Sequence, residues 1–217
     1  MPDTHALDVR HHFVDAEQQK DASTLGMWIF LVTEIMFFGG MFMAYIAYRH
    51  AYPEAFAAAS EKLNVWLGGA NTLVLICSSL TMAMAVHSAA LGKKKPMIAF
   101  LLLTLGLGSV FLGIKGIEYH DKFVHHEVPG PNFAFEGPDP QHATLFFSLY
   151  FGMTGLHALH MIVGVAIILV LLWQAHKNHF SAEWHTPVEM FGLYWHFVDI
   201  IWIFLFPLLY LIDRSGR

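Results

Sequence analysis

The sequence predicts an all-α fold, a polytopic membrane bundle of five transmembrane helices. Of its 217 residues, 56% are hydrophobic and only 13% are charged, whereas an average soluble domain is about 25% charged. It also contains five apolar stretches that reach the roughly 20 residues needed to cross a bilayer. Since lipid offers the backbone no hydrogen-bond partners, each stretch must be helical.

The first apolar stretch covers 24–48 and is interrupted only by Glu34. The other four are 65–87, 96–117, 142–173 and 188–212. Residues 1–22 are polar and acidic, which predicts a polar N-terminal tail before a five-helix transmembrane domain over 23–217. Ser23 or Thr24 is expected to cap the first helix, because both hydroxyls can accept from free N–H groups of a first turn.

Other helix ends are also marked. Pro96 suits the first turn of the third helix, Thr186-Pro187-Val188-Glu189 fits a capping box, and Pro207 is tolerated near the end of the fifth helix. Residues 88–95 read as a short turn, and 118–141, rich in Pro, Gly, His and acid, as a long loop. Gly40 with Ala44, and Thr104 with Gly108, predict close backbone approach.

Charge limits the function classes. The formal net charge is −5 and the one basic tract is Lys93-Lys94-Lys95, so nucleic-acid binding is not expected. Lysines in a short loop favour the cytoplasmic side. This places the N-terminus in the cytoplasm and the C-terminus on the outer side. The single cysteine, Cys77, can form no intrachain disulfide.

Five ionisable residues lie inside the apolar stretches: Glu34, His157, His160, His196 and Asp199. Such groups are expensive in hydrocarbon and are functional candidates by default. His157 and His160 are three residues apart and share one helix face, and so do His196 and Asp199. Imidazoles and carboxylates placed in this way could bind a metal or carry protons. We favour hydrogen bonding and packing between helices over both alternatives.

Two further features leave alternatives open. Glu34 could be a proton carrier, a buried acid donating one hydrogen bond, or the polar end of a lipid-headgroup site. The clusters Glu118-Tyr119-His120-Asp121 and His125-His126-Glu127 resemble metal-ligand groups, but a solvated interface is the favoured interpretation. The sequence has no nucleotide-binding glycine motif, CxxC or nucleophile elbow, so no catalytic, cofactor-binding or metal-ligating residue is assigned.

Four stretches resemble subunit III of the haem-copper terminal oxidases. Residues 28–42 resemble the family's helix with an intramembrane glutamate, here Glu34, and 111–119 its helix end with a Glu-Tyr pair, here Glu118 and Tyr119. The most specific stretches are 154–164 (TGLHALHMIVG) and 194–206 (YWHFVDIIWIFLF). The resemblance covers about residues 23–212.

The resemblance implies a non-redox subunit with no cofactor of its own and no separate catalytic centre, in a proton-pumping complex of aerobic respiration. Haem and copper are expected in partner subunits. The chain would pack on catalytic subunit I beside other oxidase subunits, and support stability and proton uptake. It would also bind phospholipid, with contacts expected at Glu34, His157 and His196.

The mitochondrial-type subunit has seven helices, and this chain has the equivalent of the last five. It therefore looks like the short bacterial form, found in cytochrome c and quinol oxidases, which implies a bacterial inner membrane. The missing pair forms one wall of the family's lipid cleft. Two alternatives remain: an accessory subunit of a nitric-oxide reductase, and an independent proton-linked or metal-ion transporter.

Overall fold

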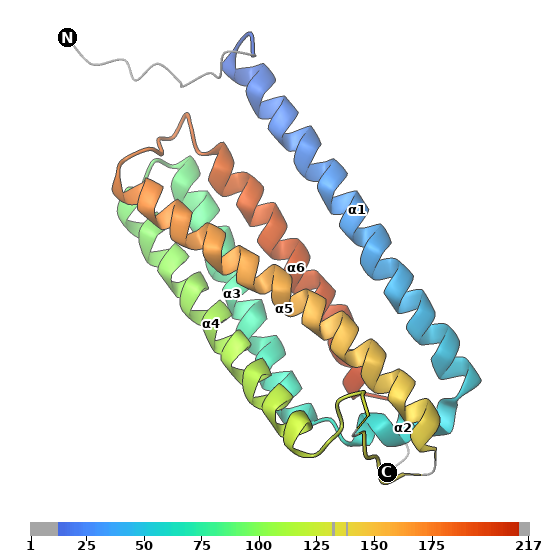
Figure 1. Cartoon of the computed structure of the whole chain (residues 1–217). Helices are drawn as coiled ribbons and strands as arrows, with labels where there is room; N and C mark the ends of the chain where they lie inside the picture. The colour runs from blue at the N-terminus through green and yellow to red at the C-terminus, as the bar shows by residue number, and fades with distance from the viewer. Residues whose placement is uncertain (1–12, 132, 138, 213–217) are drawn as a thin grey trace, which may run out of the picture.

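A computed structural model describes residues 13–131, 133–137 and 139–212 (Figure 1). Five of its helices are long and apolar enough to cross a membrane, and no strand is present in those residues. This confirms the predicted all-α fold and its five spans. The helices in chain order are α1 (Ala16–Ala51), α2 (Pro53–Glu61), α3 (Val65–Ala90), α4 (Lys94–Val124), α5 (Pro140–His176) and α6 (Thr186–Tyr210).

Helices α3, α4, α5 and α6 form an antiparallel four-helix bundle (Figure 1). Around the bundle, α3 packs on α4, α4 on α5, α5 on α6, and α6 on α3. Helix α1 lies along the outside of α5 and α6, and the short α2 lies at the end of the bundle where α6 ends. Large aromatic side chains, among them Trp195, Trp202 and Tyr150, fill the core.

Helix α1 begins earlier than the apolar pattern indicates. Asp15 is its N-cap and accepts from the Gln18 amide at 2.8 Å. Ser23 and Thr24, the predicted caps, instead donate from within the helix to carbonyls one turn back. The cap prediction was wrong because residues from Ala16 onward are good helix formers that extend the helix beyond the apolar span. The first 12 residues of the predicted tail lie outside the described residues.

Two other local predictions were wrong. The expected loop from residue 118 begins only after Val124, because α4 continues through its polar residues. The capping box at Thr186 is absent, since His185 is the N-cap of α6 without a side-chain cap bond. Glu189 Oε1 instead lies within hydrogen-bond distance of His185 Nε2, at 2.9 Å.

Helix α2 was not predicted, and it helps to satisfy the C-terminal end of α6. Ser60 donates to the Leu209 carbonyl at 2.8 Å, and Tyr45 of α1 donates to the Leu208 carbonyl at 2.7 Å. The last carbonyls of a helix have no partner within it. These two hydroxyls therefore satisfy carbonyls that would otherwise have no partner at the end of α6.

Trp195 sets how closely the helices of the bundle approach. A methyl group added at Gly108 of α4 would lie 2.9 Å from its ring, and one at Gly164 of α5 would lie 2.7 Å away. Thr104 and Gly108 are both buried, and the space at Gly108 is filled by the Trp195 ring instead of a neighbouring backbone. Gly40, by contrast, faces open space within this chain.

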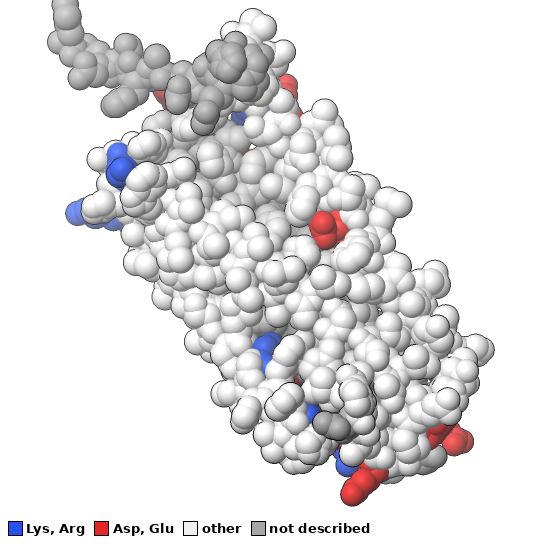
Figure 2. All heavy atoms as spheres, viewed as in Figure 1, with Lys and Arg blue, Asp and Glu red and all other residues white. Residues whose placement is uncertain are grey.

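The surface has the charge distribution of a membrane protein. Charged side chains gather at the two ends of the molecule, and the broad middle is white apart from isolated spots (Figure 2). On that middle zone α1 exposes most of its apolar side chains. The core therefore lies inside the bundle of α3, α4, α5 and α6. Helix α1 packs on the bundle along one stripe of buried side chains, Leu31, Phe38 and Tyr45.

Candidate functional site

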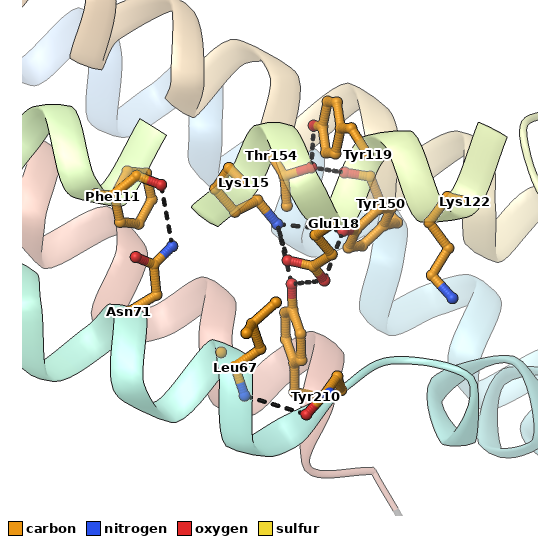
Figure 3. A network of polar contacts seen from close by, with 12 residues as sticks. Leu67, Asn71, Phe111, Lys115, Glu118, Tyr119, Lys122, Tyr150, Thr154 and Tyr210 are labelled. Atoms are coloured by element: carbon orange, nitrogen blue, oxygen red, sulfur yellow. Dashed lines mark hydrogen bonds and ion pairs between the residues drawn. The ribbon is translucent and has the colours of Figure 1, made fainter. Parts of the chain in front are cut away.

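A buried ion pair lies in the half of the bundle where α4 ends. Lys115 and Glu118 stand one turn apart on α4, and their side chains are only 4% and 5% exposed. Lys115 Nζ lies 2.9 Å from Glu118 Oε2, 3.1 Å from the Tyr150 hydroxyl and 3.0 Å from the Tyr210 hydroxyl (Figure 3). An ammonium has three donors, so each one has an acceptor.

The carboxylate is equally well satisfied. Glu118 Oε1 accepts from Tyr150 at 2.9 Å and from Tyr210 at 2.5 Å. Two buried charges offset their desolvation only when their remaining hydrogen-bonding groups are filled, and here they are. The network joins α4 to α5 through Tyr150 and to α6 through Tyr210. It is a closed arrangement that holds three helices together.

Aromatic rings surround the ammonium. Lys115 Nζ lies 5.0 Å from the Trp202 ring centre, 5.1 Å from that of Tyr150 and 5.4 Å from that of Tyr119. Ring faces within about 6 Å of a cation attract it. This attraction helps to offset the cost of removing the Lys115 ammonium from water. Tyr119, which the family resemblance singled out with Glu118, bonds Thr154 of α5 at 2.5 Å.

A second buried pair lies nearer the C-terminal end of α4. Lys122 Nζ lies 2.6 Å from Glu127 Oε2 and donates to the Lys62 carbonyl at 2.7 Å. It ties the loop after α4 to the segment before α3. Lys115, Glu118 and Lys122 thus share one buried face of α4. The family resemblance singled out Glu118, whereas Lys115 and Lys122 were not predicted, because this face continues past residue 117, where the polar residues suggested a loop. The spacing of three and four along this face was the available signal.

Glu34 contacts a histidine of a neighbouring helix. Its Oε2 lies 3.2 Å from His160 Nε2, although not at a hydrogen-bond angle, and both side chains are less than a fifth exposed. His160 Nδ1 lies 2.9 Å from the Leu156 carbonyl, which can only accept, so that nitrogen carries a proton. The contact links α1 to α5.

His157 and His160 diverge despite their spacing of three. His157 is 1% exposed and packs against Phe111 and Trp202 in the bundle core, whereas His160 packs against Phe38 of α1. The two histidines face different helices, an outcome that their common helix face alone could not reveal.

His196 and Asp199 lie on α6 next to α3. His196 Nδ1 lies 2.7 Å from the Ser79 hydroxyl. Asp199 is 2% exposed, and Ser79 is also near its carboxyl. Among the described residues, however, neither carboxyl oxygen has a hydrogen bond of acceptable geometry. No bond between a histidine and Asp199 is formed in the described part of the chain, and His196 contacts the serine.

The histidine-rich segment is mostly solvated. His125 Nδ1 lies 3.4 Å from Asp121 Oδ1, and both side chains are more than half exposed. Glu118 and Tyr119 point inward instead. Within residues 13–131, 133–137 and 139–212, no three His, Cys, Asp or Glu side chains are grouped as metal ligands. That the chain binds no metal or cofactor stays a prediction.

Comparison with known proteins identifies the family that this chain resembles. Residues 10–213 match the family described as cytochrome c oxidase subunit III. The chain is 32% identical to cytochrome c oxidase subunit 3 of Thermostichus vulcanus over 92% of both chains. It is 33% identical to that of a Synechocystis strain, covering 88% of this chain and 76% of the relative. It is 31% identical to that of Pelomedusa subrufa, covering 85% of this chain and 67% of the relative.

Proposed function

This chain belongs to the cytochrome c oxidase subunit III family, and on that premise we propose that it is a non-redox subunit that packs on catalytic subunit I of a haem-copper oxidase. It supports the stability and the proton uptake of that subunit, which holds the haem and copper. The observation that carries the proposal is the family match over residues 10–213. Membership in the family makes the chain part of a membrane complex with other oxidase subunits.

The internal contacts support a structural role. Glu34 is engaged by His160, Lys115 by Glu118, and Lys122 by Glu127. The first contact links α1 to α5, and the other two belong to hydrogen-bond networks that link α4 to other segments of the chain. Polar groups used in this way fix helix positions, as a supporting subunit requires.

Helix α1 offers the face best suited to a partner helix. Ile35, Met36 and Met43 are 56%, 72% and 68% exposed. An added methyl group at Gly39 or Gly40 would meet nothing within 4 Å. Small residues let helix backbones approach closely in membranes, so we assign this outward face of α1 to subunit I.

Phospholipid is the second proposed partner. Of the three residues for which the resemblance implies lipid contact, Glu34 and His196 are half-buried at the surface, whereas His157 is enclosed. We therefore expect headgroup or glycerol contacts at Glu34 and His196. The proposed location is the bacterial inner membrane with the N-terminus in the cytoplasm, since Lys93, Lys94 and Lys95 lie at the short α3–α4 connection.

The test is purification in mild detergent through a tag on this chain, followed by an optical spectrum and identification of companions. We expect haem absorbance and a large haem-bearing partner. Companions of a nitric-oxide reductase would favour the accessory-subunit alternative. Ion flux in vesicles that contain this chain alone would favour the transporter alternative, and either result would overturn the proposal.

A matched pair of variants tests the assigned face. Gly40→Leu on α1 should reduce the amount of haem-bearing partner recovered, because the larger side chain holds the backbones apart. Gly113→Leu on α4 is the control, since Gly113 is also exposed and has nothing within 4 Å. Equal recovery with both variants would contradict the assignment of α1.

A further inference from the structure

His157 is a polar side chain enclosed by aromatic rings. Its ring centre lies 5.3 Å from that of Phe111 and 5.1 Å from that of Trp202, and the residue is 1% exposed. A neutral imidazole has one donor and one acceptor. Among the described residues, neither ring nitrogen has a hydrogen-bond partner. Buried polar groups in native proteins are satisfied by protein or by ordered water.

Asn71 of α3 also has an unpaired polar atom, and like His157 it contacts Phe111. It is 1% exposed, and its Nδ2 donates to the Phe111 carbonyl at 3.4 Å (Figure 3). Its Oδ1 has no partner in the described part of the chain. Phe111 therefore contacts both residues, Asn71 through its backbone and His157 through its ring. Two sets of unpaired polar atoms flank one residue.

The other polar groups nearby are already paired. Trp202 Nε1 donates to the Thr72 hydroxyl at 3.1 Å, and Lys115 has its three acceptors in Glu118, Tyr150 and Tyr210. A ligand of both residues must donate to the Asn71 amide oxygen, and at His157 it can donate to one ring nitrogen or accept from the other. An amide oxygen and an imidazole without a carboxylate are a poor set for a hard cation, but they suit water.

We propose that an ordered water molecule is bound between Asn71 Oδ1 and the His157 ring as an integral part of the bundle core. It donates to the amide oxygen, and its second bond is with a ring nitrogen of His157. Proteins hold on the order of one buried water per 27 residues, each with two to four polar partners. Such a site is therefore ordinary in a chain of 217 residues.

The arrangement of helices gives this water a specific role. In the described residues α3 and α5 are diagonal in the bundle, as are α4 and α6, and the backbones of neither pair approach closely. The α4–α6 diagonal is crossed by Lys115 and Glu118, which bond Tyr210. The water between Asn71 and His157 crosses the other diagonal, from α3 to α5.

Paired substitutions test the proposal in the assembled complex. Asn71→Leu and His157→Phe keep approximate size, and each leaves the water with one polar partner fewer. Each should lower the melting temperature, and the double variant should lower it by less than the sum, because no unpaired group remains. His157→Phe combined with Thr81→Val, whose hydroxyl bonds elsewhere, is the control and should be additive.

A cryo-EM map of the complex, at a resolution that shows other ordered waters, is the second measurement. We expect a density peak within hydrogen-bond distance of both Asn71 Oδ1 and a His157 nitrogen, and its loss in the double variant. Additive melting shifts for Asn71→Leu and His157→Phe would overturn the proposal. A direct bond between the two side chains, or no peak between them, would overturn it as well.

Discussion

Lys115 Nζ lies 2.9 Å from Glu118 Oε2 in a membrane-spanning helix, and neither side chain is more than 5% exposed. Removing one member of such a pair leaves a buried charge uncompensated, which costs about 3–5 kcal/mol. Lys115→Met and Glu118→Leu should each lower the melting temperature of the purified complex strongly. The double variant should recover part of the loss, since neither charge remains.

The control for that measurement is Lys20→Gln. Lys20 lies 3.4 Å from Glu189, and their side chains are 52% and 27% exposed. Surface pairs contribute about 0–1 kcal/mol, so this variant should melt almost as the wild type does. A Lys115→Met variant that melts like Lys20→Gln would contradict the structural role assigned to the network.

Glycine substitutions test the packing of Trp195. Gly108→Ala and Gly164→Ala place a methyl group 2.9 Å and 2.7 Å from its ring. Overpacking of this kind costs about 1–3 kcal/mol, so thermal unfolding should shift downward. Gly106→Ala on the exposed side of α4, where nothing lies within 4 Å, should leave it unchanged or raise it slightly. Equal shifts in all three would disprove the packing argument.

Glu34→Gln should leave O2 reduction by the assembled complex largely intact. The amide is isosteric and keeps the packing beside His160 Nε2, which lies 3.2 Å from the native oxygen. Oxygen consumption per haem is the measurement. Complete loss of activity in a fully assembled complex would show instead that Glu34 exchanges protons.

His160→Ala and Asp199→Ala should weaken assembly more than chemistry. His160 links α5 to Glu34 of α1, and Asp199 is enclosed where α6 meets α3. We expect less complex per cell but nearly normal turnover per haem. A normal yield with abolished turnover would contradict this expectation for either residue.

Asp139, outside the spanning segments, gives a pH-dependent contribution. The hydrogen bond from the His142 side chain lowers the pKa of the Asp139 carboxyl below its usual 3.8. A lowered pKa in the folded state means that the stabilisation is present at neutral pH and is lost as pH falls through that pKa. Amide protection in the first turn of α5 should therefore fall below about pH 3.8. Asp139→Asn should show no such dependence; an unchanged acid response in this variant would rule out the carboxyl.

The sequence predicted the membrane spans because hydrophobicity and length decide them locally. It did not predict α2, since nine residues between two spans carry no span-like signal. The Lys115 network was missed for a related reason. Polar residues after Ile117 continue the helix of α4, and only that continuation places Glu118 toward Tyr150 and Tyr210.

The partners of the polar residues depended on tertiary geometry. Spacing placed His157 and His160 on one helix, and it could not say that one faces Trp202 and the other Glu34. Likewise, nothing in the sequence near Asn71 indicates that its amide meets the Phe111 carbonyl 40 residues away. Such pairs follow from the order of helices around the bundle.

The hydroxyls of Tyr45 and Ser60, which bond the final carbonyls of α6, have a consequence for biogenesis. They are translated long before their acceptors, as are Lys115 and Glu118 before Tyr210. A nascent chain that stops short of α6 lacks the Tyr210 hydroxyl, which is one of three contacts of Lys115 Nζ and one of three of the Glu118 carboxylate. The cluster is therefore complete only once α6 has been synthesised and has packed against α4.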